Sequence, residues 1–314
     1  MRRLCFPLYN TICEIGADGS DHISLDDALR LGVKEGRRVD QLLNRFDPTS
    51  ALSNLNNGYH PGEPYPVVEE LCCLLALCEE FRRRTGGAFQ IATGGFSALW
   101  AFESPTPVPP KAEELRNYAD RIRHSRLQVD IEHGSVTIAE PGIVLDLGAV
   151  GKGYGADQVS AVLQRHGVER GYVDFGGNLL VWGKGPSGGE WTVGVQDPRA
   201  PRGKILCRFP LPQNMGSATS GGFDRYFWAE GQQYHHLLAP QSGMPVNNGL
   251  MSTTVVADSA TLADILSTSC FLLGKVDGRE LLENLEQEHQ AGGIFVDNSG
   301  EVKGVGSLSG KLQK

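Results

Sequence analysis

The choice of fold depends on "GAVGKGYGAD", residues 148–157. Within it, Gly151 to Ala156 satisfies the G-x-G-x-x-A pattern of dinucleotide-binding turns. A strand-like segment at 143–145 precedes the pattern, and Asp174 follows about twenty residues later. The P-loop pattern does not fit, because Lys152 is followed by glycine rather than by serine or threonine. The stretch alone therefore permits a doubly wound nucleotide-binding fold.

The surrounding sequence favours a different fold. A helix is expected over 156–167, but strands then follow one another with no helices between them, at 172–175, 179–182, 191–195, 205–211, 223–228, 234–238 and 252–256. A doubly wound sheet needs strands and helices to alternate, and its parallel strands are apolar, whereas Asp146 lies in the strand before the glycines. We predict an α+β fold of mainly antiparallel sheets packed against helices, as a single domain over 1–314 or as two close-packed lobes.

The first half of the chain is predicted to be mainly helical. Ser24 and Asp27 form a capping pair for a helix that extends through Leu43 and could break at Gly32 or Gly36. Apolar residues at three- and four-residue spacing predict a helix over 66–84 that stops at two glycines. A loop over 45–57, a short helix over 111–123 and a strand over 128–139 complete the prediction.

Composition excludes several classes of protein. The 314 residues are 40% apolar and 21% charged, which is typical of a globular chain. A formal charge of -8 without a basic stripe argues against a nucleic-acid partner. Seven cysteines, including the adjacent Cys72 and Cys73, have no zinc-type spacing and indicate a reducing compartment. No leader, lipoprotein anchor or membrane span is evident, so the sequence favours a cytoplasmic protein, and the trimmed form of an exported protein stays open as the alternative.

Five collinear blocks carry a resemblance to a known family: "NRFDPTSALSNLN" (44–56), "TGGAFQIATGGFSALW" (85–100), "LDLGAVGKGYGAD" (145–157), "YHHLLAPQSGMP" (234–245) and "ATLADILSTSCFLLG" (260–274). From about residue 8 to 306 the chain resembles the ApbE family, the FAD:protein FMN transferases. The resemblance implies a T-fold-like architecture and a Mg²⁺-dependent flavinylation. In that reaction FAD is cleaved, FMN is attached through a phosphoester to a threonine or serine of a partner flavoprotein, and AMP is released.

The predicted metal site begins with Asp264 and Thr268. Residues four apart on a helix project from the same face, so a carboxylate and a hydroxyl converge. Mg²⁺ prefers such oxygen ligands, although the same spacing also occurs on ordinary helix surfaces. The resemblance implies that the metal ligands are Asp264, Thr268 and the main-chain carbonyl of Ala149, and the neighbouring Ser267 could add an oxygen.

The resemblance also implies a set of nucleotide-binding residues: Tyr9, Phe46, Ala88, Phe89, Gln90, Asp146, Lys152 and Leu238. In this set Phe46 would stack on adenine, and Lys152 would offer positive charge to a phosphate. Asp146 lies between two leucines, and burying a carboxylate without a partner would cost several kcal/mol. Some partner for Asp146 is therefore expected. A turn matching the family pattern at 218–227 would let Ser220 and Gly221 frame the pocket.

His236 and Asp264 are the candidate catalytic residues, and His236 is the candidate general base. In a strand over 234–238, His236 and Leu238 would face one side and His235 the other, and the family's histidine matches His236. The acceptor would carry a D-x-x-[ST]-G-A-[ST]-like motif.

The sequence departs from the family pattern at three positions. Gln90 and Ala239 stand where the family usually has aspartate, and Ala92 where it has threonine. Two alternatives therefore stay open: an FAD pyrophosphatase, which would release FMN, and a catalytically silent FAD-binding protein.

Overall fold

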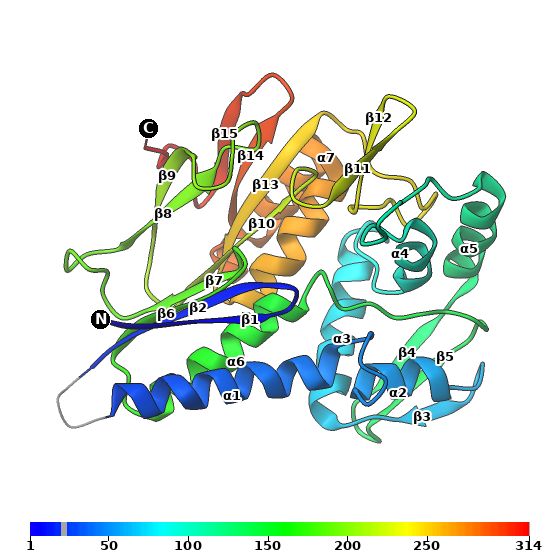
Figure 1. The fold of residues 1–314 in the computed structure, drawn as a ribbon, viewed down its shortest axis with the longest axis horizontal. Helices are drawn as coiled ribbons and strands as arrows, with labels where there is room; N and C mark the ends of the chain where they lie inside the picture. Colours follow the sequence, from blue (N-terminus) through cyan, green and yellow to red (C-terminus); the bar gives the residue numbers. More distant parts are fainter. Residues whose placement is uncertain (20–23, 314) are drawn as a thin grey trace. The chain divides into compact units, whose positions relative to one another are not determined.

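The computed structural model describes residues 1–19 and 24–313, which form two compact units. Unit 1 comprises Met1–Asp40, Gly148–Gly221 and Gly249–Lys314. Unit 2 comprises Gln41–Leu147 and Gly222–Asn248. Figure 1 shows the elements of both units in the colours of the sequence. Each unit is described separately.

Unit 1 is built on a sheet in which every neighbouring pair of strands is antiparallel. Within the described residues this sheet has eight strands in the order β1-β2-β6-β7-β10-β13-β14-β15. Their bounds are β1 Arg2–Leu8, β2 Thr11–Asp18, β6 Arg170–Phe175, β7 Leu179–Trp182, β10 Met215–Gly221, β13 Leu250–Ala257, β14 Gly292–Asp297 and β15 Val302–Gly306. The antiparallel order excludes a doubly wound fold and confirms the predicted α+β class.

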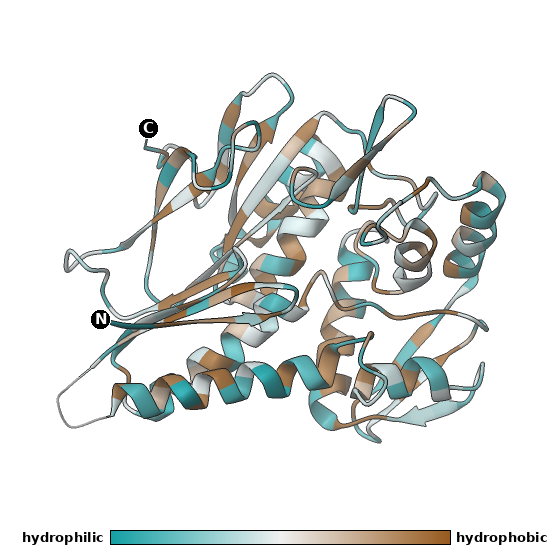
Figure 2. Cartoon of the chain, in the orientation of Figure 1, coloured by the Kyte–Doolittle hydropathy of each residue, from teal (hydrophilic) through white to brown (hydrophobic). Residues whose placement is uncertain are grey.

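Helices cover one face of this sheet: α1 (Leu25–Leu43), α6 (Gly151–Arg165) and α7 (Ala260–His289). In the core beneath them, Leu29 and Val159 from the helices meet Ile15 and Val173 from the strands. Each such side chain contributes about 1.5–3 kcal/mol by leaving water. Figure 2 shows apolar and polar segments alternating along α1, the pattern of a helix with one buried face.

A two-stranded ribbon packs on the opposite face of the sheet. It consists of β8 (Trp191–Gln196) and β9 (Ile205–Leu211), and Phe209 from this ribbon is buried with Val181 of β7. The neighbours of Val181, Leu180 and Trp182, belong instead to the core under the helices. Successive side chains of a strand point to opposite faces, so β7 serves both layers.

Unit 2 combines short helices with two small sheets. Its helices are α2 (Ala51–Gly58), α3 (Glu69–Arg84), α4 (Gly94–Trp100) and α5 (Ala112–His124). One sheet has the order β3-β5-β4, with β3 at Pro64–Pro66, β4 at Leu127–Asp130 and β5 at Ser135–Ile138. The other is the hairpin of β11 (Tyr226–Ala229) and β12 (Gln232–His235). The ring of Trp100 in α4 lies 5.2 Å from that of Tyr234 and 6.1 Å from that of Phe227, which ties this hairpin to the helices of unit 2.

The predicted helices are largely confirmed. Ser24 Oγ accepts the Asp27 N–H at 3.3 Å, and α1 continues through Gly32 and Gly36 without a break. The helix predicted over 66–84 is α3, and the one predicted over 111–123 is α5. No helix within the described ranges is long and apolar enough to cross a membrane.

Several local predictions are wrong. The loop predicted over 45–57 contains most of α2, because Ser50 Oγ accepts the Ser53 N–H at 2.9 Å and Leu52 and Leu55 are buried. The strand predicted over 128–139 is the hairpin of β4 and β5. Six strands were not predicted: β1, β2, β3, β10, β14 and β15. Among them, β10 is rich in small polar residues and glycine, which lack the usual β-forming signal.

Candidate active site

Three glycines of the opening stretch, Gly151, Gly153 and Gly155, lie inside α6, which begins at Gly151 rather than at the predicted 156. A Cβ atom at Gly153 would lie 2.2 Å from the carbonyl oxygen of Ala260 and 2.8 Å from Cβ of Asp264. A Cβ at Gly155 would lie 2.5 Å from the hydroxyl oxygen of Tyr9. The glycine pattern therefore allows α6 to approach its neighbours closely and does not form the dinucleotide-binding turn that its sequence permits.

Asp264 of α7 lies against the first turn of α6. The Gly153 N–H donates to its Oδ2 at 3.0 Å, and the residue is 4% exposed. Burial raises the pKa of Asp264, while the charge of Lys152 and the Gly153 hydrogen bond act in the opposite direction. The Gly153 N–H, which binds Oδ2, is the donor that the described residues supply to the Asp264 carboxylate. The other oxygen, Oδ1, accepts no hydrogen bond from those residues.

Three hydroxyls gather one turn further along α7. Ser220 Oγ, at the end of β10, lies 2.9 Å from Ser267 Oγ and 3.1 Å from Thr268 Oγ1. Ser220 and Gly221 are thus in a strand, and not in the turn that was predicted over 218–227. Ser267 is fully buried and donates to the Asp264 carbonyl at 3.0 Å, whereas Thr268 is 8% exposed. Thr268 is therefore better placed than Ser267 to offer an oxygen.

This oxygen set suits Mg²⁺ better than zinc. It contains the carboxylate of Asp264 and the hydroxyls just described, while Ala149 lies in the turn that precedes α6. Nowhere in residues 1–19 and 24–313 do three or more His, Cys, Asp or Glu side chains gather as a metal-binding group. Mg²⁺ is commonly held by one or two carboxylates and keeps several waters, whereas zinc requires a fuller set of nitrogen or sulfur ligands.

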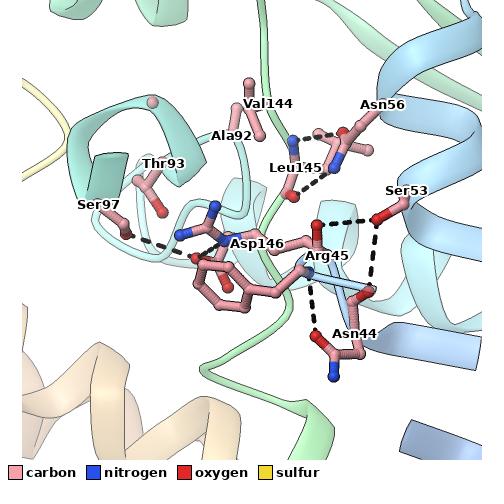
Figure 3. Close-up of polar contacts among 12 residues, drawn as sticks. Asn44, Arg45, Ser53, Asn56, Ala92, Thr93, Ser97, Val144, Leu145 and Asp146 are labelled. Atoms are coloured by element: carbon pink, nitrogen blue, oxygen red, sulfur yellow. Dashed lines mark hydrogen bonds and ion pairs between the residues drawn. The ribbon is translucent and has the colours of Figure 1, made fainter. Parts of the chain in front are cut away.

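In unit 2, Asp146 forms an ion pair that the sequence did not identify. Arg45 Nε lies 2.7 Å from Asp146 Oδ2, and the Ser97 hydroxyl donates to the same oxygen at 3.5 Å (Figure 3). The Arg45 and Asp146 side chains are 12% and 22% exposed. Arg45 is thus the partner that was expected for the Asp146 carboxylate, which lies between two leucines. In the sequence, only its position in the block at 44–56 connects Arg45 with the site.

The segment around Asp146 was predicted to be a strand at 143–145, but it lies outside any strand. Side chains replace the missing strand partner. Asn56 accepts the Leu145 N–H at 2.8 Å and donates to the Leu145 carbonyl at 2.9 Å, while the Ile143 and Val144 N–H groups donate to Tyr59 and Tyr118. These bonds hold the backbone that carries Asp146 in one conformation, and Figure 3 shows the two between Asn56 and Leu145.

Phe46 is presented to solvent beside this ion pair. Phe46 is 76% exposed, and the Arg45 guanidinium lies 4.0 Å from the centroid of its ring. Asn44 Oδ1 accepts the Phe46 N–H at 3.0 Å, and Ser53 donates to the Arg45 carbonyl at 2.8 Å. An exposed ring on an ordered backbone can stack on a planar ligand.

The segment containing Ala88, Phe89 and Gln90 is folded onto its own core. Phe89 is 1% exposed, and Ala88 and Gln90 are half-buried. Gln90 Oε1 accepts the Ala92 N–H at 3.1 Å, so glutamine supports the local turn while lacking the negative charge of the aspartate in the family pattern.

The two adjacent histidines have different environments. The Nε2 of His235 lies 3.0 Å from the Val246 carbonyl, its Nδ1 accepts the Leu237 N–H at 3.2 Å, and burial lowers its pKa. His236 Nδ1 lies 3.3 Å from the Arg225 carbonyl. The predicted strand alternation through Leu238 is wrong, because β12 ends at His235 and the chain bends at His236. Both His235 nitrogens bind backbone groups, which leaves His236 as the candidate base.

Leu238 and Tyr9 are both packed. Leu238 is 7% exposed and forms a bridge with Pro245. Tyr9 lies in the turn between β1 and β2, where its φ of 51° is left-handed. Its hydroxyl donates to the Gly36 carbonyl at 3.2 Å and its ring lies 5.4 Å from that of Phe175. Burial raises the pKa of Tyr9. Tyr9 therefore contributes to the core of unit 1.

Comparison with known proteins identifies the family to which this chain belongs. The sequence profile of the ApbE family matches residues 10–292. The chain belongs to the ApbE family. It is 32% identical to the FAD:protein FMN transferase of Treponema pallidum over 244 residues, 74% of this chain and 66% of that protein. It is 30% identical to a protein of the same name from Klebsiella pneumoniae over 275 residues, 84% of this chain and 83% of that protein.

The fold of this ApbE chain also matches that of a solved relative. The crystal structure of the ApbE protein from Thermotoga maritima superposes with a TM-score of 0.87 and 26% identity, covering 98% of this chain and 97% of that one. The five blocks that carry the ApbE resemblance fall in both units, and the block at 145–157 passes from unit 2 into unit 1 after Leu147.

Proposed function

We propose that this ApbE protein transfers FMN from FAD to a threonine or serine hydroxyl of an acceptor protein, in a Mg²⁺-dependent reaction that releases AMP. The relatives named FAD:protein FMN transferase support the reaction class. The observation that carries the metal dependence is the carboxylate of Asp264, held at the start of α6 one helical turn from the Thr268 hydroxyl.

The residues of unit 1 would hold the metal and attract the diphosphate. Asp264, Thr268 and the Ala149 carbonyl are the proposed ligands, and Mg²⁺ bound there would neutralise the charge that develops on the diphosphate. Lys152, in the first turn of α6, adds a positive side chain to the positive end of the helix dipole. Both features favour a phosphate group at this helix terminus.

A second set of residues would bind the nucleotide and accept a proton. Phe46, whose ring is exposed, would stack on adenine, and the Asp146 carboxylate, held by Arg45, would accept hydrogen bonds from flavin or ribose. His236 would take the proton of the acceptor hydroxyl. The acceptor oxygen then bonds to the FMN phosphorus as the bond from that phosphorus to the bridging oxygen breaks, and AMP leaves with that oxygen.

The test is incubation with FAD, MgCl₂ and a peptide carrying a D-x-x-T-G-A-T motif. We expect covalent yellow fluorescence of the peptide on a denaturing gel and one AMP for each flavin attached. A matched peptide with valine at the acceptor threonine should stay unlabelled. AMP with free FMN and no labelled peptide would instead identify a pyrophosphatase.

A different result would indicate a silent binder. Binding of FAD without cleavage in the presence of Mg²⁺ would contradict transferase activity. The loss of charge at Gln90 is the feature that favours that alternative, since Gln90 keeps the turn but not the carboxylate.

A further inference from the structure

Helices α6 and α7 cap each other's first turn. The carboxylate of Asp264 in α7 accepts the Gly153 N–H in the first turn of α6. In return, Asp157 of α6 accepts hydrogen bonds from the first turn of α7. The N–H groups of a first helical turn have no partner within their own helix, so each helix supplies what the other lacks.

Asp157 uses both of its carboxylate oxygens in this cap. Oδ1 accepts the Ala260 N–H at 2.9 Å, and Oδ2 accepts the Thr261 N–H at 2.8 Å and also the Thr261 hydroxyl. Burial raises the pKa of Asp157, whereas these donors favour its charged form, as does the positive end of the α7 dipole. An amide at this position would turn an N–H group toward one of these donors.

The cap lies one turn before the proposed metal ligand. Asp264 follows Ala260 by four residues and so projects from the same face of α7, toward α6. The two helices also approach closely here, since a Cβ at Gly153 would lie 2.2 Å from the Ala260 carbonyl oxygen. Ser259, by contrast, caps α7 from within its own chain segment, through the Leu262 N–H at 3.1 Å, and does not connect it to α6.

We propose that Asp157 is a positioning residue for the metal site, which fixes α7 against α6 so that Asp264 and Thr268 keep their place beside the turn at 148–150. This inference rests on the proposed metal role of Asp264. Partners that orient metal ligands typically change metal affinity by 10- to 100-fold when they are removed.

The experiment measures Mn²⁺ binding to the full chain by electron paramagnetic resonance, with Mn²⁺ as the probe for the Mg²⁺ site. The variants are Asp157→Asn, Thr261→Val, Ser259→Ala and Asp264→Ala. We expect Asp157→Asn to weaken Mn²⁺ binding by about 10- to 100-fold. Thr261→Val removes one of the hydrogen bonds to Asp157 and should weaken binding by about two- to fivefold.

Ser259→Ala is the matched control, because it removes a cap from the same helix terminus without touching the connection to α6. It should lower thermal stability but leave Mn²⁺ affinity within about twofold of the unmodified protein. In transfer assays, Asp157→Asn should raise the Mg²⁺ concentration needed for half-maximal rate and leave kcat at saturating Mg²⁺ nearly unchanged.

The outcomes separate the two proposals. Equal Mn²⁺ affinities for Asp157→Asn and Ser259→Ala would overturn the positioning role, and if Asp157→Asn does not fold, equal affinities for Thr261→Val and Ser259→Ala would do so. Full Mn²⁺ binding by Asp264→Ala would instead overturn the metal assignment on which the inference rests.

Discussion

Replacing Gly153 by alanine tests the close approach of α6 to α7. The added Cβ would lie 2.2 Å from a backbone oxygen of Ala260 and 2.8 Å from Cβ of Asp264. The backbone oxygen cannot rotate away, so the two helices must separate. Their separation lengthens the 3.0 Å hydrogen bond between the Gly153 N–H and the Asp264 carboxylate.

The expected change in the free energy of unfolding combines one stabilising effect and two destabilising ones. Alanine gains about 1 kcal/mol over glycine inside a helix. Overpacking of this kind costs about 1–3 kcal/mol, and a weakened hydrogen bond to a charged group costs about 1.5–3 kcal/mol. We therefore expect Gly153→Ala to lower the free energy of unfolding by about 3 kcal/mol, and to weaken Mn²⁺ binding as well.

The assay is urea denaturation followed by circular dichroism, together with the Mn²⁺ titration. Gly36→Ala is the matched control, because its Cβ would meet only side-chain atoms, the nearest being Leu8 Cδ2 at 3.2 Å. That variant should stay within about 1 kcal/mol of the unmodified protein. A Gly153→Ala protein with unchanged stability and unchanged Mn²⁺ affinity would refute this account of the glycine pattern.

Further predictions concern the base, the ion pair, the metal and the thiols. His236→Ala should slow transfer by about a hundredfold with FAD affinity unchanged; a rate near that of the unmodified protein would mean another base. Arg45→Ala leaves the half-buried Asp146 without its ion-pair partner. It should weaken FAD binding, measured by fluorescence titration, and lower the free energy of unfolding by about 1–3 kcal/mol, measured by urea denaturation. The control Arg38→Ala, in which the lost arginine is more exposed, should lower the free energy of unfolding by at most about 1 kcal/mol. Removal of divalent cations with EDTA should abolish transfer, and added MgCl₂ should restore it; transfer that persists in EDTA would contradict the metal dependence. A thiol reagent at pH 8 should modify the exposed Cys73 in the folded protein, and the exposed Cys5 more slowly because its hydrogen bond to Glu14 raises its pKa; the buried thiols should react only on unfolding, since burial raises the pKa of Cys13 to about 12.

Local patterns were sufficient for part of the site. The spacing of Asp264 and Thr268 placed them on one helical face because helix periodicity is a property of neighbouring residues, and α7 is helical at both positions. The same reasoning failed at His236, where the strand pattern of 234–238 did not reveal that the chain bends after His235. A bend of this kind depends on tertiary contacts such as the one between His236 and Arg225.

Partners far apart in sequence could not be predicted. Arg45 and Asp146 are separated by 101 residues, and Asp157 and Ala260 by 103. The need for a partner of Asp146 was evident from its leucine neighbours, but its identity depends on the folded chain. The glycines at 151–155 were ambiguous for a related reason: glycine permits both a tight turn and a close helix contact, and only the position of α7 decides between them.

The most direct test of the central claim is a crystal structure of the protein soaked with MnCl₂ and FAD, with anomalous scattering used to locate Mn²⁺. The account predicts an anomalous peak about 2.0–2.2 Å from a carboxylate oxygen of Asp264, with the Thr268 hydroxyl and the Ala149 carbonyl in the same shell. A peak elsewhere, with FAD bound and Asp264 still hydrogen-bonded only to Gly153, would contradict it.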